Sequence, residues 1–123
     1  MKKNLVITSL LGALTIILGA FGAHALKETL SIDQLKSFET AVKYQMYHVI
    51  VLLIINMYPT FSEKIKNILS YLFFAGILFF SGSIYAITLG VNPKSIWFIT
   101  PIGGLFFIIG WLKLAYSFFK KDD

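Results

Sequence analysis

The sequence predicts an all-α integral membrane protein, built as an up-down bundle of four transmembrane helices. Hydrophobic residues make up 57% of its 123 residues and charged residues only 14%, and the mean hydropathy is +0.77. A soluble domain is about half apolar and about a quarter charged. A chain this short cannot bury so much apolar surface in its own interior, so the bilayer must be its solvent. We expect a single domain over residues 1–123.

Each expected helix is placed by an apolar run and by the polar or helix-breaking residues that flank it. The expected helices cover residues 5–26, 33–58, 65–89 and 95–119. The connections between them are short, which favours antiparallel neighbours.

The first apolar run, Leu5 to Ala23, contains no charge and reaches roughly 29 Å at about 1.5 Å per residue. Two features also resemble a signal peptide: Lys2 and Lys3 precede the run, and Ala23-His24-Ala25 resembles a cleavage site. The run is longer than the apolar region of such peptides, which is about 7–15 residues. We therefore expect the first segment to be retained as a membrane helix.

The second segment is half polar. The apolar run Val49 to Tyr58 is too short to span a bilayer, so the helix must include the polar residues before it. Ser31 or Asp33 is the expected N-cap, and Pro59 closes the helix.

The third and fourth segments are more uniformly apolar. Ile65 to Leu89 follows a helix-start signal at Ser62, and a turn is expected around Gly90 to Pro93. The fourth helix is expected from about Ser95, with Pro101 early enough to be tolerated in or near its first turn.

The lysines are distributed unequally between the two ends of this bundle. One end carries seven: Lys2, Lys3, Lys64, Lys66, Lys113, Lys120 and Lys121. The other end carries four: Lys27, Lys36, Lys43 and Lys94. Positive residues favour the cytoplasmic side, so we expect a plasma-membrane protein with both termini in the cytoplasm. We also expect the bilayer itself, and anionic lipids near the cytoplasmic lysines, to be partners.

Several function classes are disfavoured by composition. All 11 basic residues are lysines, and arginine is the usual residue for recognising nucleic acid, so no nucleic-acid partner is expected. The absence of cysteine excludes thiolate metal sites and a cysteine nucleophile. We expect no cofactor.

Small residues recur at helical spacing and predict close helix packing. The candidate packing residues are Gly12, Gly19, Gly22, Gly82, Ala86, Gly103 and Gly110. Their spacing does not decide whether they pack within one chain or between copies in a homo-oligomer.

The candidate functional residues form a polar cluster at the start of the second helix and the end of the first. They are His24, Glu39, Lys43, Tyr44, Gln45 and His48. The two histidines are expected near the same end of adjacent helices. Ionisable residues inside a membrane often mark a functional site. The alternative is that the charged half of the helix lies among lipid headgroups, where its charges are solvated.

Several kinds of chemistry stay open at this cluster. The histidines could bind a metal with Glu28 or Glu39, relay protons, or only form hydrogen bonds at the interface. We predict hydrogen bonds and no metal. His48 is expected to face the bundle interior and to share a network with His24 or a tyrosine. A serine–histidine nucleophilic pair with Ser81 or Ser83 is conceivable, but no G-x-S-x-G elbow accompanies it.

Four motifs in register resemble one bacterial membrane-protein family. They are Gly19-Ala-Phe-Gly-Ala-His24, Tyr44-Gln-Met-Tyr-His48, Phe80-Ser-Gly-Ser-Ile-Tyr85, and Thr100-Pro-Ile-Gly-Gly104 with Gly110-Trp111. Together they resemble the domain of unknown function 423 family, also called uncharacterised protein family 0382, with transmembrane protein 256 as its eukaryotic relative. The resemblance covers essentially the whole chain. It implies a multi-pass plasma-membrane protein and supplies no catalytic residues.

Three functional hypotheses follow. The favoured one is a non-enzymatic protein that packs with partners or with itself. The alternative is a small transporter or channel assembled around the polar face of the second helix. A lipid-headgroup enzyme that uses His24 and His48 is disfavoured, because an enzyme would show a denser set of convergent polar groups.

Overall fold

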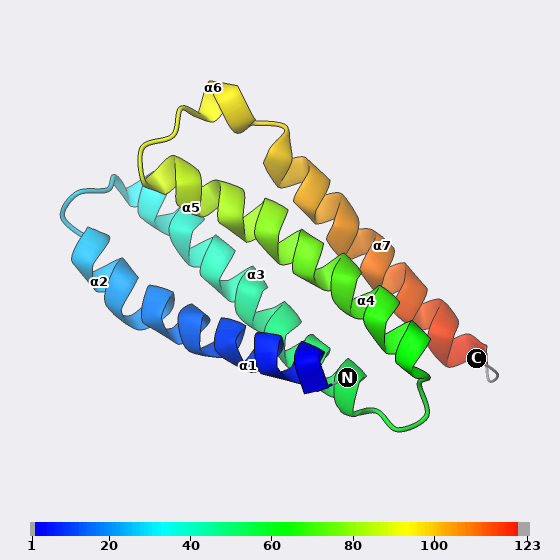
Figure 1. Cartoon of the computed structure of the whole chain (residues 1–123). Coiled ribbons are helices and arrows are strands. Elements are labelled where there is room, and N and C mark those ends of the chain that lie inside the picture. The colour runs from blue at the N-terminus through cyan, green and yellow to red at the C-terminus, as the bar shows by residue number, and fades with distance from the viewer. Residues whose placement is uncertain (1, 121–123) are drawn as a thin grey trace.

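The computed structural model describes residues 2–120, and over that range all its regular elements are helices. Together these elements form four continuous or nearly continuous helices that are long and apolar enough to cross a membrane. These four spans are Lys2–Leu26, Ile32–Met57, Glu63–Thr88 and Pro93–Phe119. Figure 1 shows them side by side with alternating chain direction. The N-terminus, the α3–α4 connection and the end of α7 lie at one end of the bundle. The predicted all-α up-down membrane bundle is confirmed.

Three of the four spans are built from more than one helical element. The first span contains α1 (Lys2–Ile16), a π-helical turn (Ile17–Gly22) and α2 (Ala23–Leu26), and the second is α3 (Ile32–Met57). The third contains α4 (Glu63–Gly76), a second π-helical turn (Ile77–Ser81) and α5 (Gly82–Thr88). The fourth contains α6 (Pro93–Ile96) and α7 (Ile99–Phe119). The four spans begin one to three residues earlier than expected, because hydropathy marks the apolar stretch and not the polar first turn of a helix.

Side-chain caps fix the starts of the second and third spans. The Ser31 hydroxyl accepts from the Gln34 amide at 3.1 Å, and the Gln34 side chain accepts from the Ser31 amide at 2.9 Å. The Ser62 hydroxyl accepts from the Ile65 amide at 3.2 Å. Ser31 and Ser62 are both caps that the sequence predicts, and α3 is helical from Ile32 through its polar half.

The fourth span differs from the expected single helix. It begins at Pro93 with Asn92 as its cap, then breaks at Trp97 and Phe98 before α7 starts. Pro101 explains the break, because it has no amide to donate to the Trp97 carbonyl and its ring crowds that carbonyl. Pro101 therefore lies in the first turn of a new helix, α7, and not inside one continuous fourth helix.

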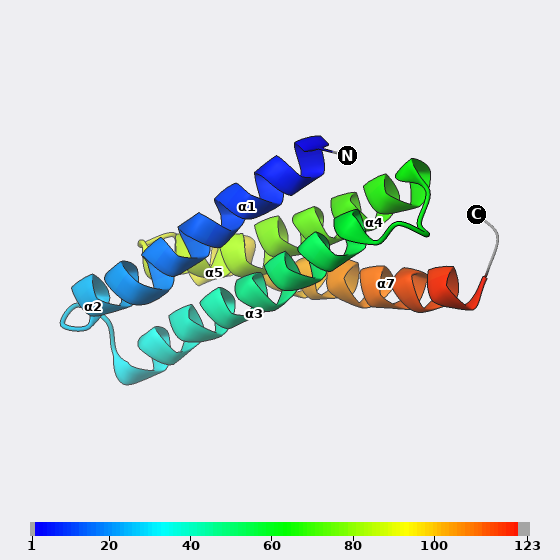
Figure 2. The same ribbon diagram turned by 90° about the horizontal axis from the view of Figure 1, so that it is seen from below.

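The second and third spans are the centre of the bundle. Helix α3 contacts α1 on one side and the third span on the other, and α7 packs against the far side of the third span. Figures 1 and 2 show α1 and α7 at opposite edges. The buried apolar core is Val49, Leu52, Ile55, Phe61, Leu69, Phe73, Ile77, Phe107 and Leu114. No residue of α1 belongs to it; the residues that α1 buries are all polar: Asn4, Thr8 and Thr15.

Most of the predicted small-residue stripes are used inside the chain. A Cβ at Gly12, Gly19 or Gly22 would meet side chains of α3, at 3.5 Å for Gly12 and 3.1 Å for Gly19. A Cβ at Gly110 would meet the Phe73 ring at 2.8 Å, and one at Gly103 would overlap the backbone of Phe80. These glycines therefore let the first span approach α3, and α7 approach the third span.

The stripe on the third span behaves differently. A Cβ at Gly82 would meet only its own preceding turn, through the Ile77 carbonyl and the Leu78 side chain, each at 3.9 Å. Ala86 is half-buried. Between the third span and α7, the close approach at Phe80 is made by Gly103 of α7.

Candidate functional site

The inward side of α3 carries three polar side chains that each reach another span: Gln45, His48 and Asn56. They follow one another at intervals of three and eight residues, so they lie on the face of α3 that turns away from lipid. All three are at most 4% exposed. They form three separate hydrogen-bonded groups along the bundle.

Gln45 joins the first, second and third spans. Its Nε2 donates to the Thr15 hydroxyl at 2.8 Å and to the Leu11 carbonyl at 3.3 Å. Its Oε1 accepts from the Tyr85 hydroxyl at 2.7 Å. The Thr15 hydroxyl donates in turn to the Leu11 carbonyl at 2.6 Å. The amide of Gln45 thus donates to the first span and accepts from the third.

His48 joins α3 to α7. The Trp111 indole N–H donates to its Nε2 at 3.1 Å, and its Nδ1 lies 2.6 Å from the Tyr44 carbonyl. An indole nitrogen only donates and a carbonyl only accepts. The geometry therefore assigns the neutral tautomer with hydrogen on Nδ1. The ring also stacks on Phe107, with centroids 3.8 Å apart and planes 7° from parallel.

An asparagine cluster lies toward the end of the bundle that holds the N-terminus. Asn4 Nδ2 donates to Asn56 Oδ1 at 3.2 Å and to Asn67 Oδ1 at 2.8 Å. Asn56 Nδ2 donates to the Ser70 hydroxyl and to the Leu52 carbonyl, at 2.8 and 2.9 Å. Asn4 Oδ1 and the buried hydroxyl of Thr8 have no hydrogen-bond partner within residues 2–120. Sequence analysis missed this cluster.

The serines of the third span are occupied by other partners. Ser81 donates to the Ala41 carbonyl of α3 at 2.7 Å. The Ser83 hydroxyl contacts Thr100 and donates to the Phe80 carbonyl at 3.0 Å. The hypothetical serine–histidine nucleophilic pair is therefore not formed, because His48 is hydrogen-bonded to Trp111 and to the Tyr44 carbonyl.

The two histidines do not meet, contrary to expectation. His24 is exposed in α2, and Gly22 beside it faces Phe38 of α3, whereas Gly12 faces Val49. His48 lies 16 residues after the start of α3, about 24 Å of helix rise from that end of the bundle. The expected proximity was wrong because the polar half of α3 adds helix length between the connection and His48. Over residues 2–120, no three histidine or carboxylate side chains are grouped as metal ligands.

The remaining predicted residues lie on the outward side of α3. Glu39 and Lys43 are exposed, and Tyr44 is 41% exposed with its ring packed on Phe80 at 4.9 Å. Glu39 and Lys43 line a groove of about 370 Å³ between the first span and α3. The predicted cluster is thus divided: Gln45 and His48 lie inside, and the charged residues lie outside.

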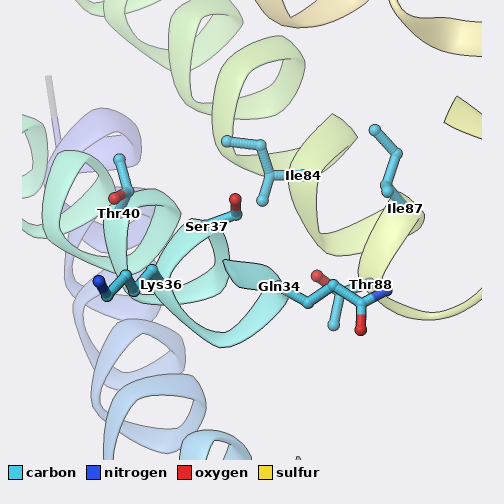
Figure 3. A pocket seen from close by; sticks show the side chains of 7 residues that line it. All are labelled: Gln34, Lys36, Ser37, Thr40, Ile84, Ile87 and Thr88. Atoms are coloured by element: carbon cyan, nitrogen blue, oxygen red, sulfur yellow. The ribbon is translucent and has the colours of Figure 1, made fainter. Parts of the chain in front are cut away.

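A second groove, of about 310 Å³, lies between α3 and α5 near the end of the bundle opposite the termini. Figure 3 shows Ser37, Thr40 and Gln34 of α3 facing this space, with Ile84 and Thr88 across from them. Its lining is largely neutral, since Lys36 is the one charged residue among the described residues that line it. It offers hydroxyl and amide groups and no acid–base pair.

Comparisons with known proteins agree with the membrane bundle. Residues 18–104 match the family described as "Protein of unknown function (DUF423)". A UPF0382 membrane protein of Haemophilus influenzae is 39% identical over 122 residues, which is 99% of this chain and 98% of the relative. A UPF0382 membrane protein of Staphylococcus aureus is 42% identical over 120 residues, which is 98% of each chain. No solved structure matches the chain.

The match extends across all four spans at about 40% identity, and the relatives are named as membrane proteins. The family match itself covers the end of the first span, all of the second and third spans, and the start of the fourth. The chain therefore belongs to the DUF423 family of membrane proteins.

Proposed function

We propose that the chain is a non-enzymatic plasma-membrane protein that acts by binding partners in or at the bilayer. The observation that carries this proposal is that the buried polar side chains of α3 are already bonded to other spans. Gln45 uses both ends of its amide, and His48 uses both ring nitrogens. A general base or a metal ligand needs a free lone pair, and neutral His48 has none left.

Selective acylation of histidine tests the proposal. Diethyl pyrocarbonate attacks a free imidazole nitrogen, and the chain has two histidines that serve as each other's control. We expect peptide mass spectrometry of the folded protein in detergent to show modified His24 and protected His48. Denaturation should make both reactive. Equal rates in the folded protein would mean that His48 is accessible for chemistry and would remove the main support for a non-enzymatic role.

The orientation is part of the same proposal. Seven lysines against four support cytoplasmic termini. Because the chain has no cysteine, single cysteines at Lys3 or Lys120 should resist impermeant thiol reagents in intact cells, while those at Asp33 or Lys94 should be labelled. The reverse pattern would reject the orientation.

Self-association is one form that this binding role takes. The first span has the least internal packing. Within an apolar stretch of 18 residues, 11% of its residues are buried, against 39% in each of the two central spans. A cysteine at Leu10, which is 66% exposed, should therefore cross-link two copies. A cysteine at Ile54 on α3, which is 58% exposed, is the matched control and should cross-link less. Equal yields at both positions would reject a specific contact.

A small transporter or channel built on the polar face of α3 is the second candidate. It is favoured by the unpaired oxygens of Asn4 and Thr8, buried between α1 and its neighbours among the described residues. Such atoms are where water or a small polar solute would bind. Proteoliposomes should then shrink faster than empty liposomes after an osmotic shift, and Thr8→Val should slow them. Wild-type rates equal to those of empty liposomes would reject this candidate.

A further inference from the structure

A basic cavity lies between the start of α4 and the end of α7. Its volume is about 470 Å³, and three lysines from the two helices line it: Lys64, Lys113 and Lys120. Ser62 and Tyr116 also line it, and Ile68 forms part of its apolar wall. Helices α4 and α7 run in opposite directions, so the first turn of one lies beside the last turns of the other (Figure 1).

The arrangement of charge in this cavity favours an anion. Lys113 lies on α7, Lys120 directly follows its last residue, and Lys64 lies across from them on α4. None of the described side chains that line the cavity is acidic. The positive end of the α4 dipole lies at the same place, and Glu63 in that first turn is paired with Lys66. Three ammonium groups in one cavity repel one another unless an anion lies between them.

The depth of Lys113 indicates where the anion comes from. It lies about 10 Å of helix rise inside Lys120, which directly follows the last residue of α7. A lysine at that depth must extend toward the headgroups, and its ammonium lies 5.5 Å from the ring centroid of Tyr116. Tyrosine is typical of the bilayer interface. A phospholipid supplies both a phosphate at this level and acyl chains beside Ile68.

We propose that this cavity binds the phosphate of an anionic phospholipid headgroup. The proposal names a partner for the binding role given above and rests on it. The groove at the opposite end has a single lysine among its described lining residues and lacks this cluster, so the basic cavity makes the two ends of the bundle chemically different. The phosphodiester is held by the three ammonium groups, and the uncharged glycerol part lies against Ser62 and Tyr116.

Native mass spectrometry of the full chain tests this site. The probes are phosphatidylglycerol, phosphatidylcholine and inorganic phosphate, each added to the detergent-solubilised protein. Phosphatidylglycerol should bind more tightly than phosphatidylcholine, because choline places a positive charge beside the lysines. Inorganic phosphate should neither bind nor compete at equal concentration. Equal binding of the two lipids, or phosphate that displaces phosphatidylglycerol, would overturn the assignment to an anionic lipid.

Charge variants locate the site. Lys113→Gln should weaken phosphatidylglycerol binding about fivefold, and the triple change of Lys64, Lys113 and Lys120 to glutamine about a hundredfold. Lys113→Arg keeps the charge and should bind like wild type. Lys36→Gln, in the groove at the opposite end, is the matched control and should also bind like wild type. A triple variant that melts normally but keeps its lipid would refute the site, whatever the reactivity of His48.

Discussion

The two outer helices of the bundle are held by different kinds of contact. The first span packs on α3 through buried threonine and asparagine residues and through glycines that meet side chains at 3.1–3.5 Å. Helix α7 packs on the third span through phenylalanines and through glycines that leave no space for a Cβ. The first contact is polar and has room for a methyl group at Gly12, whereas the second is aromatic and has none at Gly103.

This difference follows from the absence of a hydrophobic driving force between helices in lipid. Apolar side chains gain little by leaving lipid for one another, so membrane helices associate through close packing and hydrogen bonds. Helix α7 uses close packing, with Gly103 against the backbone of Phe80. The first span uses hydrogen bonds, with Thr15 and Asn4 as its main contacts. Substitutions should therefore affect the two contacts differently.

The largest effect is expected at Gly103. In Gly103→Ala the new methyl group would overlap the backbone of Phe80, which cannot rotate away, so α7 must move off the third span. We expect a loss of about 3 kcal/mol or more, at the upper end of overpacking costs. Thermal melting in detergent measures it. Gly104→Ala is the matched control: a Cβ there meets nothing within 4 Å, so this variant should melt like wild type. Equal melting of both variants would contradict the tight contact.

The next effect is expected at His48, the polar link between α3 and α7. His48→Leu removes the acceptor for Trp111 and the stack on Phe107. We expect a loss of about 2 kcal/mol, from one interhelical hydrogen bond and one stacked pair. His48→Gln keeps an acceptor and should lose less. If His48→Leu melts no lower than His48→Gln, the hydrogen bond to Trp111 contributes nothing.

A smaller effect is expected at Gln45, the link to the first span. Gln45→Leu leaves the hydroxyls of Thr15 and Tyr85 without their partner. The Thr15 hydroxyl keeps its bond to the Leu11 carbonyl, so the Tyr85 hydroxyl alone loses its acceptor and the cost should be about 1 kcal/mol. Tyr85→Phe removes only one of these bonds and should cost less in the same melting assay. A larger loss in Tyr85→Phe would show that Gln45 is not the centre of this network.

The four spans and the caps of the second and third could be predicted from the sequence, because both depend on local information. Hydropathy marks the four apolar runs, and Ser31 and Ser62 are caps that act within their own first turns. The fold class therefore followed from the apolar runs, and the family followed from the resemblance of four sequence motifs. The break between α6 and α7 was not predicted. Pro101 was expected to be tolerated in a first turn, but it leaves the Trp97 carbonyl without an amide donor.

The partners of the polar side chains could not be predicted in the same way. Pairing depends on how far each helix slides along the next, and that register is set by contacts such as Gly12 against Val49. His48 was therefore expected near His24 but lies beside Trp111. The asparagine cluster joins residues from three spans, and Asn4 and Asn67 lie near span ends, where polar residues are ordinary. Only Asn56, inside an apolar run, gave a signal.

The smallest effect is expected at Gly12, and it separates the two contacts most clearly. A Cβ at Gly12 would lie 3.5 Å from a Val49 methyl group, an ordinary van der Waals distance, so Gly12→Ala should fit without moving α1. Alanine also favours the helix over glycine, by up to about 1 kcal/mol in water. We therefore expect the melting temperature to stay the same or rise slightly. Gly110→Ala, whose Cβ would lie 2.8 Å from the Phe73 ring, is the counterpart in the tight contact and should melt lower. If Gly12→Ala destabilises the protein as much as Gly110→Ala does, the first span is packed as tightly as α7, and the contrast between the two outer helices does not hold.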